Sequence, residues 1–461
     1  MLPRCLVIPA LLIAVSSAHA DPIEGPVALV PPTAPEPAAP TPDPAPGADE
    51  LAKAPPADQA SGVAVARPYR RHPIANMLLA IPRTVVLFVL TGPRYGASRV
   101  DSYLESRSPN AFGRDVHQSW RFGFTADWET MLGPSLGLRV GRELGAKAVV
   151  DVYGGLFGAR GQSGGLRVSA GPFTDASLEP ALTFDAGRSL DRVFAGVGDE
   201  PQTGRDPYGH GRRVGFEERR IAIGATVPAT VGPVKAAVTG RYEDIATDAG
   251  SAAFADAYDG SLLVGLDERD RAVTGEVSVA FDARKRRFRW IRPASPSSGF
   301  YARGALAYTR GEASRTGKFS TGRASLEARQ LFDLFNGDRV LSIGVFTDAI
   351  SADADAVPFE RLPALGGQQR LRAFARDQYR DRNATYGDLQ YEWALGNDSR
   401  GYLFVEGGSV QPSPTDLAVS RIHLGYGVGI RTLSDAATSA RFQIAGSDDG
   451  DIGFYLQLGA L

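Results

Sequence analysis

From about Gln118 to the end of the chain, short runs of residues alternate between apolar and small or polar side chains. In Val273–Phe281, for example, valine and phenylalanine fall on one face, and Thr274, Glu276 and Ser278 fall on the other. A period of two is typical of a β-strand, because successive side chains point to opposite sides of the sheet. Since Gly, Asp, Asn and Pro separate the runs, we predict an all-β fold with many tight turns.

The polar face of these runs carries charge, and the apolar face is continuous enough to meet lipid. A soluble sandwich would instead point its charges outward and pack its aliphatic side chains into a closed core. We therefore predict a transmembrane antiparallel β-barrel with sixteen strands, closed because an open sheet edge in hydrocarbon would leave backbone groups unpaired. The charged residues assigned to the lumen are Arg220, Arg241, Glu276, Arg303, Arg323, Glu327 and Arg329.

The chain before the barrel divides into three segments. Residues 1–20 have a positive start, an apolar stretch and Ala18-His19-Ala20, which together indicate a secretory signal peptide cut after Ala20. Residues 21–67 are rich in Pro and Ala and are predicted to be a disordered periplasmic linker. Residues 68–117 are predicted to be a short helical periplasmic or plug segment, and residues 118–461 the outer-membrane barrel.

Composition excludes several classes of function. The 50 basic and 52 acidic residues balance, so nucleic acid is not an expected partner. The single cysteine, Cys5, lies in the signal peptide, so the mature chain has no thiol for a disulfide, a metal site or catalysis. Apart from His19 in the signal peptide, the histidines have no metal-ligand spacing. His423 falls on the lumen face of its strand and could mimic a catalytic base, but the chain has no Gly-x-Ser-x-Gly motif. We expect neither a cofactor nor enzymatic activity. The glycine-rich stretch Gly154–Gly165 is interpreted as turns.

Counting strands back from the C-terminus assigns each loop to a side. If Ile452–Leu458 ends in the periplasm, Gly446–Asp451 and Gln411–Val419 are external and Gly396–Arg400 is periplasmic. Ser351–Arg382 then becomes the sixth outer loop and the longest one that the pattern delimits. It is dense in arginine and long enough to fold back into the lumen.

Several short motifs, in this order and spacing, resemble the BamA/TamA family of outer-membrane barrels, also called bacterial surface antigens. That family carries Val/Ile-Arg-Gly-Phe/Tyr in its sixth outer loop, where this chain has Leu371-Arg372-Ala373-Phe374 after Gly366-Gly367. It carries Phe/Gly-x-Asp-x-Gly on its thirteenth strand, where this chain has Phe404-Val405-Glu406-Gly407-Gly408. Further similar segments are Asp282–Arg284 with Pro296–Gly299, Tyr391-Glu392, and Gly427–Arg431.

The resemblance implies a pairing and a role. In the family the loop arginine reaches through the lumen to the strand carboxylate, which implies that Arg372 pairs with Glu406. It also implies that the chain helps polypeptides or lipids into or across the outer membrane through a weak seam between the first and last strands. The chain departs from the family at Ala373, which restricts the backbone where glycine would permit a positive φ, and at Glu406, where the family has aspartate. The segment before the barrel is also too short for a substrate-receiving periplasmic repeat, so a passive or structural barrel is the alternative.

The strongest basic run, Arg284–Trp290, falls on a predicted periplasmic turn. Arg286, Arg287 and Arg289 could meet phospholipid headgroups there, with Trp290 anchored at the interface. The expected partners are therefore outer-membrane lipids, a polypeptide or lipid client, and a periplasmic accessory protein.

Overall fold

The structure is a computed structural model, and it describes residues 120–459 with short gaps at 130–132, 145–147, 158–160, 171–177, 287–295, 336, 396–398, 417–420 and 434–437. The signal peptide, the linker and the helical segment predicted over residues 1–117 lie outside the described residues. The barrel predicted from residue 118 onward has its first strand at Trp120.

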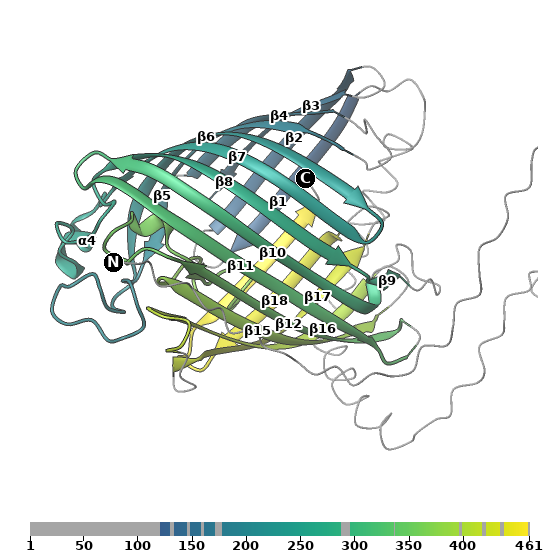
Figure 1. Cartoon of the computed structure of the whole chain (residues 1–461). Coiled ribbons are helices and arrows are strands. Elements are labelled where there is room, and N and C mark those ends of the chain that lie inside the picture. The colour runs from purple at the N-terminus through teal and green to yellow at the C-terminus, as the bar shows by residue number, and fades with distance from the viewer. Residues whose placement is uncertain are drawn as a thin grey trace, which may run out of the picture. The chain divides into compact units, whose positions relative to one another are not determined.

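Within the described residues, sixteen long strands form one antiparallel barrel (Figure 1). They are β1 (Trp120–Glu129), β2 (Gly133–Leu144), β3 (Ala148–Phe157), β4 (Gly161–Ala170), β5 (Ala181–Phe194), β6 (Val214–Val231), β7 (Val234–Asp248), β8 (Arg269–Asp282), β10 (Pro296–Ala313), β11 (Gly317–Asp333), β12 (Arg339–Ile350), β15 (Asn383–Ala394), β16 (Ser399–Gln411), β17 (His423–Leu433), β18 (Thr438–Ser447) and β19 (Ile452–Gly459). Each strand pairs with the next, and β1 pairs with β19 to close the barrel. The predicted fold class and strand number are confirmed.

Five smaller elements complete the described part of the chain. β9 (Lys285–Arg286) pairs with β10, while β13 (Ala364–Leu365) and β14 (Tyr379–Arg380) form a two-stranded ribbon inside the long loop 351–382. The same loop holds the 3₁₀ turn η2 (Phe359–Arg361), and loop 249–268 holds the helix α4 (Ala252–Ala257). No helix in this part of the chain has the length and apolar character needed to cross a bilayer.

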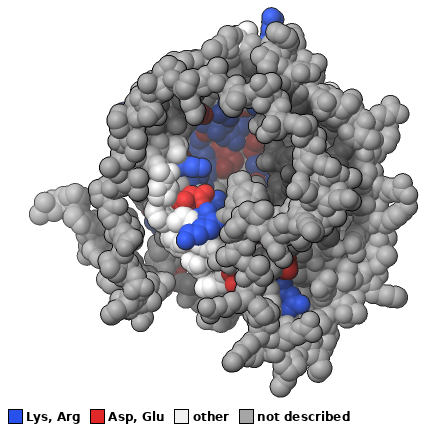
Figure 2. Space-filling model, turned by 90° about the vertical axis from the view of Figure 1, so that its right-hand side faces the viewer, with Lys and Arg blue, Asp and Glu red and all other residues white. Residues whose placement is uncertain are grey.

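The two faces of the barrel wall have the polarity that the sequence predicted. The outward side chains of β8 are exposed and apolar, with Val273, Val277 and Val279 between 50 and 59 % exposed. The inward face holds ion pairs such as Arg329 with Asp388 at 2.8 Å. Viewed from the end opposite α4, the barrel is hollow, and its interior shows both basic and acidic side chains (Figure 2). The arrangement is an apolar wall around a charged lumen, as in a membrane barrel.

The glycine-rich stretch Gly154–Gly165 is not mainly turn, as the sequence suggested, because most of it lies in β3 and β4. The reason lies across the ladder between these strands. Tyr153 pairs with Gly165, and a Cβ at Gly165 would collide with the tyrosine ring. Glycine is therefore used here to make room for a lumen aromatic rather than to bend the chain.

The end of the barrel that carries α4 holds a buried apolar cluster, which we call the loop cap. It is formed mainly by Phe194, Phe216, Phe254, Tyr258 and Phe359, drawn from the ends of β5 and β6 and from loops 249–268 and 351–382. Their ring centroids lie 5.0–5.5 Å apart for the Phe194–Phe254, Phe194–Phe359 and Phe216–Phe359 pairs. Long loops thus meet over this end and exclude water from their contact.

Candidate functional site

Loop 351–382 folds against the inner surface of the last five strands. Leu371 and Phe374 are buried, together with Leu365 and Tyr379 of the same loop, against aromatic side chains that include Phe404 of β16. Burial of these apolar side chains fixes where the loop motif sits. The loop is therefore part of the packed interior rather than a solvated surface connection.

Arg372 and Glu406 are in direct contact. The Nε of Arg372 donates to Oε2 of Glu406 at 2.9 Å, and the backbone N–H of Arg372 donates to Oε1. The hydroxyl of Tyr386 donates to Oε2 at 2.9 Å, so three donors surround this carboxylate. Glu406 is 1 % exposed and Arg372 is 7 % exposed, so both charges are removed from water and depend on each other.

Two further contacts fix the orientation of the Arg372 guanidinium. Its central carbon lies 3.5 Å from the centroid of the Phe404 ring, and its Nη1 donates to Gln390 Oε1 at 3.3 Å. A planar guanidinium can stack on a ring and donate in its own plane at the same time. The strand motif thus contributes both the carboxylate and the aromatic surface that bind the arginine.

The backbone of the loop motif explains why Ala373 is accommodated. Among the described non-glycine residues, positive φ occurs at Leu371 (54°) and Asp377 (57°) near the motif, and Ala373 is not one of them. Gly366 and Gly367 carry the largest positive φ values in the loop, at 121° and 94°. Positive φ therefore occurs on both sides of Arg372, at Gly366, Gly367 and Leu371 before it and at Asp377 after it, but not at Ala373. The restriction expected at Ala373 does not arise.

The glycines of the strand motif make space for the loop. A Cβ at Gly408 would lie 2.9 Å from Cδ1 of Leu365 and 3.2 Å from Cδ1 of Leu371. A Cβ at Gly407 would lie 2.9 Å from Cγ2 of Ile422. Side chains at these two positions would displace the loop or the next strand, so the motif matches the packing.

The same loop contacts both strands that close the barrel, which the sequence did not predict. Arg376 Nη2 lies 2.8 Å from Glu129 Oε2 on β1. The Tyr455 hydroxyl on β19 donates to the Phe374 carbonyl at 3.5 Å, and a Cβ at Gly453 would collide with the Arg372 carbonyl oxygen. We call these contacts the seam brace. No local sequence signal pairs Arg376 with Glu129, because the two residues meet only once the barrel has closed.

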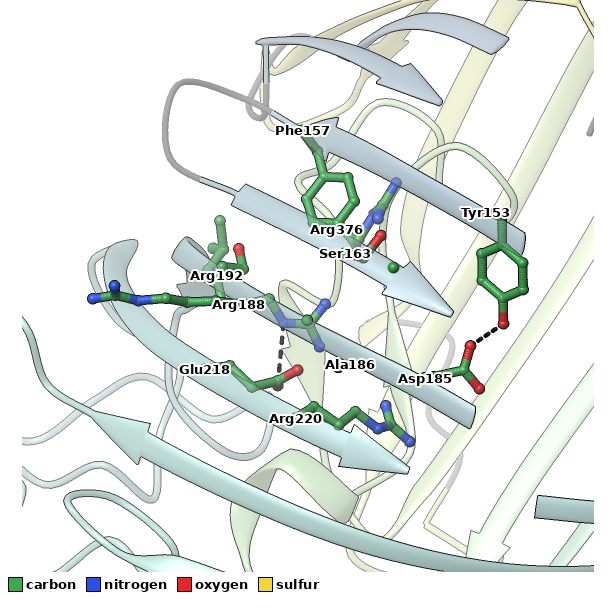
Figure 3. A pocket seen from close by; sticks show the side chains of 14 residues that line it. Tyr153, Phe157, Ser163, Asp185, Ala186, Arg188, Arg192, Glu218, Arg220 and Arg376 are labelled. Atoms are coloured by element: carbon green, nitrogen blue, oxygen red, sulfur yellow. Dashed lines mark hydrogen bonds and ion pairs between the residues drawn. The ribbon is translucent and has the colours of Figure 1, made fainter. Parts of the chain in front are cut away.

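A cavity of about 280 Å³ lies beside the seam brace on the lumen side of β3 to β6 (Figure 3). Arg192, Glu218, Arg220 and Arg376 line it, together with Tyr153, whose hydroxyl donates to Asp185. The arginines are each ion-paired: Arg192 with Glu218 at 3.4 Å, Arg220 with Glu243, and Arg376 with Glu129. The basic groups that line the cavity are thus paired with acidic partners, and the cavity was not predicted from the sequence.

His423, considered from the sequence as a lumen histidine, is held between carboxylates rather than beside a nucleophile. Its Nε2 lies 2.7 Å from Asp199, and its Nδ1 lies 3.5 Å from Asp449. Its ring stacks on Tyr379 at 3.9 Å, and Tyr379 stacks on His210 at 4.8 Å. Burial and the nearby His423 lower the pKa of His210. Across the described residues, no group of three or more His, Cys, Asp or Glu side chains could hold a metal ion.

Two other sets of predicted residues are the segments Tyr391-Glu392 and Gly427–Arg431 and the expected headgroup contacts. Glu392, in the Tyr391-Glu392 segment, forms an ion pair at 2.6 Å with Arg431, which ends the Gly427–Arg431 segment. Among the predicted headgroup contacts, Arg286 ends β9, while Arg287, Arg289 and Trp290 lie outside the described residues.

Comparison with known proteins yields structural neighbours only. The sequence matches no family model and no curated protein. The structure is similar to BamA from Haemophilus ducreyi lacking POTRA domains 1–3, with a TM-score of 0.55 and 12 % identity over 75 % of this chain and 70 % of that one. CdiB from Acinetobacter baumannii (TM-score 0.48, 14 % identity, 74 % of this chain, 60 % of that one) and CdiB from Escherichia coli (0.47, 13 %, 75 % and 64 %) also match.

The fold expected from the motifs is therefore the fold found. Within its described residues this chain is a sixteen-stranded barrel whose fold is similar to that of BamA. At this level of identity the likeness establishes architecture, and function has to be inferred from the chain's own residues.

Proposed function

We propose that this chain is an outer-membrane barrel that helps polypeptides or lipids enter or cross the membrane through the junction of β1 and β19. The observation that carries the proposal is the shortness of this junction, which we call the seam. Five residue pairs join the strands, from Thr125–Gly459 to Glu129–Tyr455, whereas ten pairs join β1 to β2. A short ladder has fewer hydrogen bonds to break, so the barrel is expected to open first at the seam.

The seam brace supports the same proposal. Arg376 contacts β1, and Phe374 and Arg372 contact β19, so one loop bridges the two strands from inside. The Arg372–Glu406 pair holds that loop to β16. An interior loop that touches both strands of this short ladder is well placed to hold the seam closed between openings. This role needs no turnover chemistry.

A reversible crosslink tests the proposal. Ala126 and Leu458 are directly paired across the seam, and their positions in the alternation place both side chains outside the lumen. Paired residues of antiparallel strands are close enough for a disulfide. In cells depleted of the wild-type protein, A126C/L458C should fail to restore the levels of other outer-membrane proteins or of surface lipid until a reductant is added.

The matched control is V140C/V152C, which places a disulfide between paired outward positions of β2 and β3 away from the seam. It should restore those levels with and without reductant. If depletion leaves outer-membrane proteins and lipids unchanged, the passive or structural barrel is correct. If the oxidised seam variant is fully active, transport does not use the seam.

A further inference from the structure

The outer wall of the barrel changes from apolar to basic toward the end that carries α4. On β8 the outward residues begin with Arg269 and Arg271 and continue as Val273 and Val277. On β10 the outward Leu306 and Tyr308 are followed by Arg310, which is paired with Val273 across the ladder. Paired residues of antiparallel strands share a face, so these arginines stand on the same surface as the exposed valines.

The basic residues form a groove with excess positive charge. It has a volume of about 510 Å³ and is lined mainly by Arg269, Arg271, Arg310, Glu312 and Lys318. Asp244 pairs with Arg269 at 2.6 Å and with Arg271 at 3.3 Å. Arg310 and Lys318 form no ion pair with any residue that the structure describes. Four cations thus face two carboxylates, Asp244 and Glu312. Glu312 stands opposite Lys318 across the ladder but forms no ion pair with it among the described residues.

A second groove shares Arg269 and shows the same combination of charge and apolar surface. It has a volume of about 970 Å³ and reaches Arg188 and Arg219 at its basic end. Exposed apolar side chains, among them Leu138, Leu156 and Ile221, line the rest of it. Glu217 pairs with both Arg188 and Arg219, at 2.7 and 2.6 Å, so this groove carries less free charge than the first.

We propose that the groove around Arg310 binds the phosphorylated headgroup of a membrane lipid in the leaflet at the α4 end of the barrel. The arginines donate to the phosphate oxygens, and the acyl chains lie along Val273, Leu306 and Tyr308. These three apolar side chains are 58–66 % exposed, and a free anion bound at the arginines would leave them exposed. A lipid satisfies both parts of the surface in one molecule. This inference rests on the membrane setting of the proposed function, not on opening of the seam.

The test is lipid binding by the purified full chain in a non-ionic detergent, measured by native mass spectrometry. The probes are a diphosphorylated acylated glucosamine disaccharide, the same lipid after phosphatase treatment, and inorganic phosphate. The wild type should prefer the phosphorylated lipid. Binding should weaken about fivefold for each charge removed in R310Q and R310Q/K318Q, since each basic residue near an anionic headgroup contributes roughly that factor.

Two further variants sharpen the test. D244N removes the carboxylate that competes for Arg269 and Arg271, so it should strengthen binding. R303Q removes an arginine that bonds to Glu276 at 3.1 Å inside the lumen and should leave binding unchanged. Each variant is first checked for folding by heat-modifiable migration on a gel. R310Q and R310Q/K318Q are expected to fold, because neither change removes the ion-pair partner of a described carboxylate.

The outcomes separate the sources of binding. Equal binding of the dephosphorylated lipid, or unchanged binding by R310Q/K318Q, would overturn the proposal. Inorganic phosphate that binds as tightly as the lipid would show a site for the free anion instead, which also overturns it. Because the assay needs only the folded barrel, its result does not depend on whether the seam-locked variant supports assembly.

Discussion

At the scale of single residues, the interior loop depends on one buried carboxylate. Glu406 accepts from the backbone and side chain of Arg372 and from Tyr386, so removal of any one donor leaves part of a charge unsatisfied. Exposed pairs in the same lumen are different: Arg303 and Glu276 contact each other at 3.1 Å with side chains 45 and 33 % exposed. Water screens the second pair, and its contribution to stability is correspondingly small.

The buried pair should therefore dominate the stability of the loop. R372A or E406Q is expected to lower the free energy of unfolding by about 3–5 kcal/mol, because each leaves its partner buried without a counter-charge. R303A or E276Q should cost under about 1 kcal/mol. Denaturant titration of the folded barrel measures both. A double-mutant cycle on Arg372 and Glu406 with no coupling energy would contradict the assignment.

A second residue-scale prediction concerns Glu360 in the loop cap. Burial and the neighbouring Asp270 carboxylate raise the pKa of Glu360 well above its ordinary value of 4.5. Through this group the folded state binds more protons than the unfolded state. The contribution of Glu360 to stability is therefore fully present below pH 4.5 and is lost as the pH rises toward the raised pKa. E360Q should flatten this decline and be more stable than the wild type at pH 8. Thermal unfolding from pH 4 to pH 8 tests it, and parallel curves would refute it.

At the scale of elements, alternation predicted the strands and the inward charges, because both depend on neighbours two residues apart. The order and spacing of short motifs led us to expect that Arg372 pairs with Glu406, and the two side chains are in contact. The loop cap and the seam brace were not predictable in this way. Phe254 and Phe359 come from different loops, and Arg376 and Glu129 are 247 positions apart. Only closure of the barrel brings such residues together, and the residues that flank them in the sequence do not indicate the contact.

The contact between the loop and β19 gives a prediction about that element. G453V should push the loop away, since a Cβ at this position would collide with the Arg372 carbonyl oxygen. We expect a loss of about 1–3 kcal/mol in stability and faster proteolysis of loop 351–382. The matched control is G275V, because a Cβ at Gly275 would meet no atom within 4 Å. Equal behaviour of the two variants would show that the loop does not bear on the last strand.

At the scale of the whole barrel, the two ends differ. The lumen is hollow at the end opposite α4 (Figure 2), whereas at the α4 end the loop cap packs aromatic side chains from several loops together. A cap that seals this end would make the barrel a poor passive channel, even though its interior is charged. Passage of a client along the axis would require the cap to unpack, whereas passage through the seam would leave the cap intact. The cap therefore favours the lateral route.

Conductance tests directly whether the loop cap seals the lumen. In planar bilayers the wild type should show little steady conductance, because Phe254 and Phe359 are at most 1 % exposed within the cap. F254S/F359S removes apolar contacts worth about 3–5 kcal/mol for each aromatic side chain, so the loops should separate and conductance should rise. L262S is the control: it lies in the same loop as Phe254, but its side chain is 53 % exposed, so conductance should stay low. High conductance in the wild type would instead mean that the cap does not seal the lumen, and the preference for the lateral route would lose its basis.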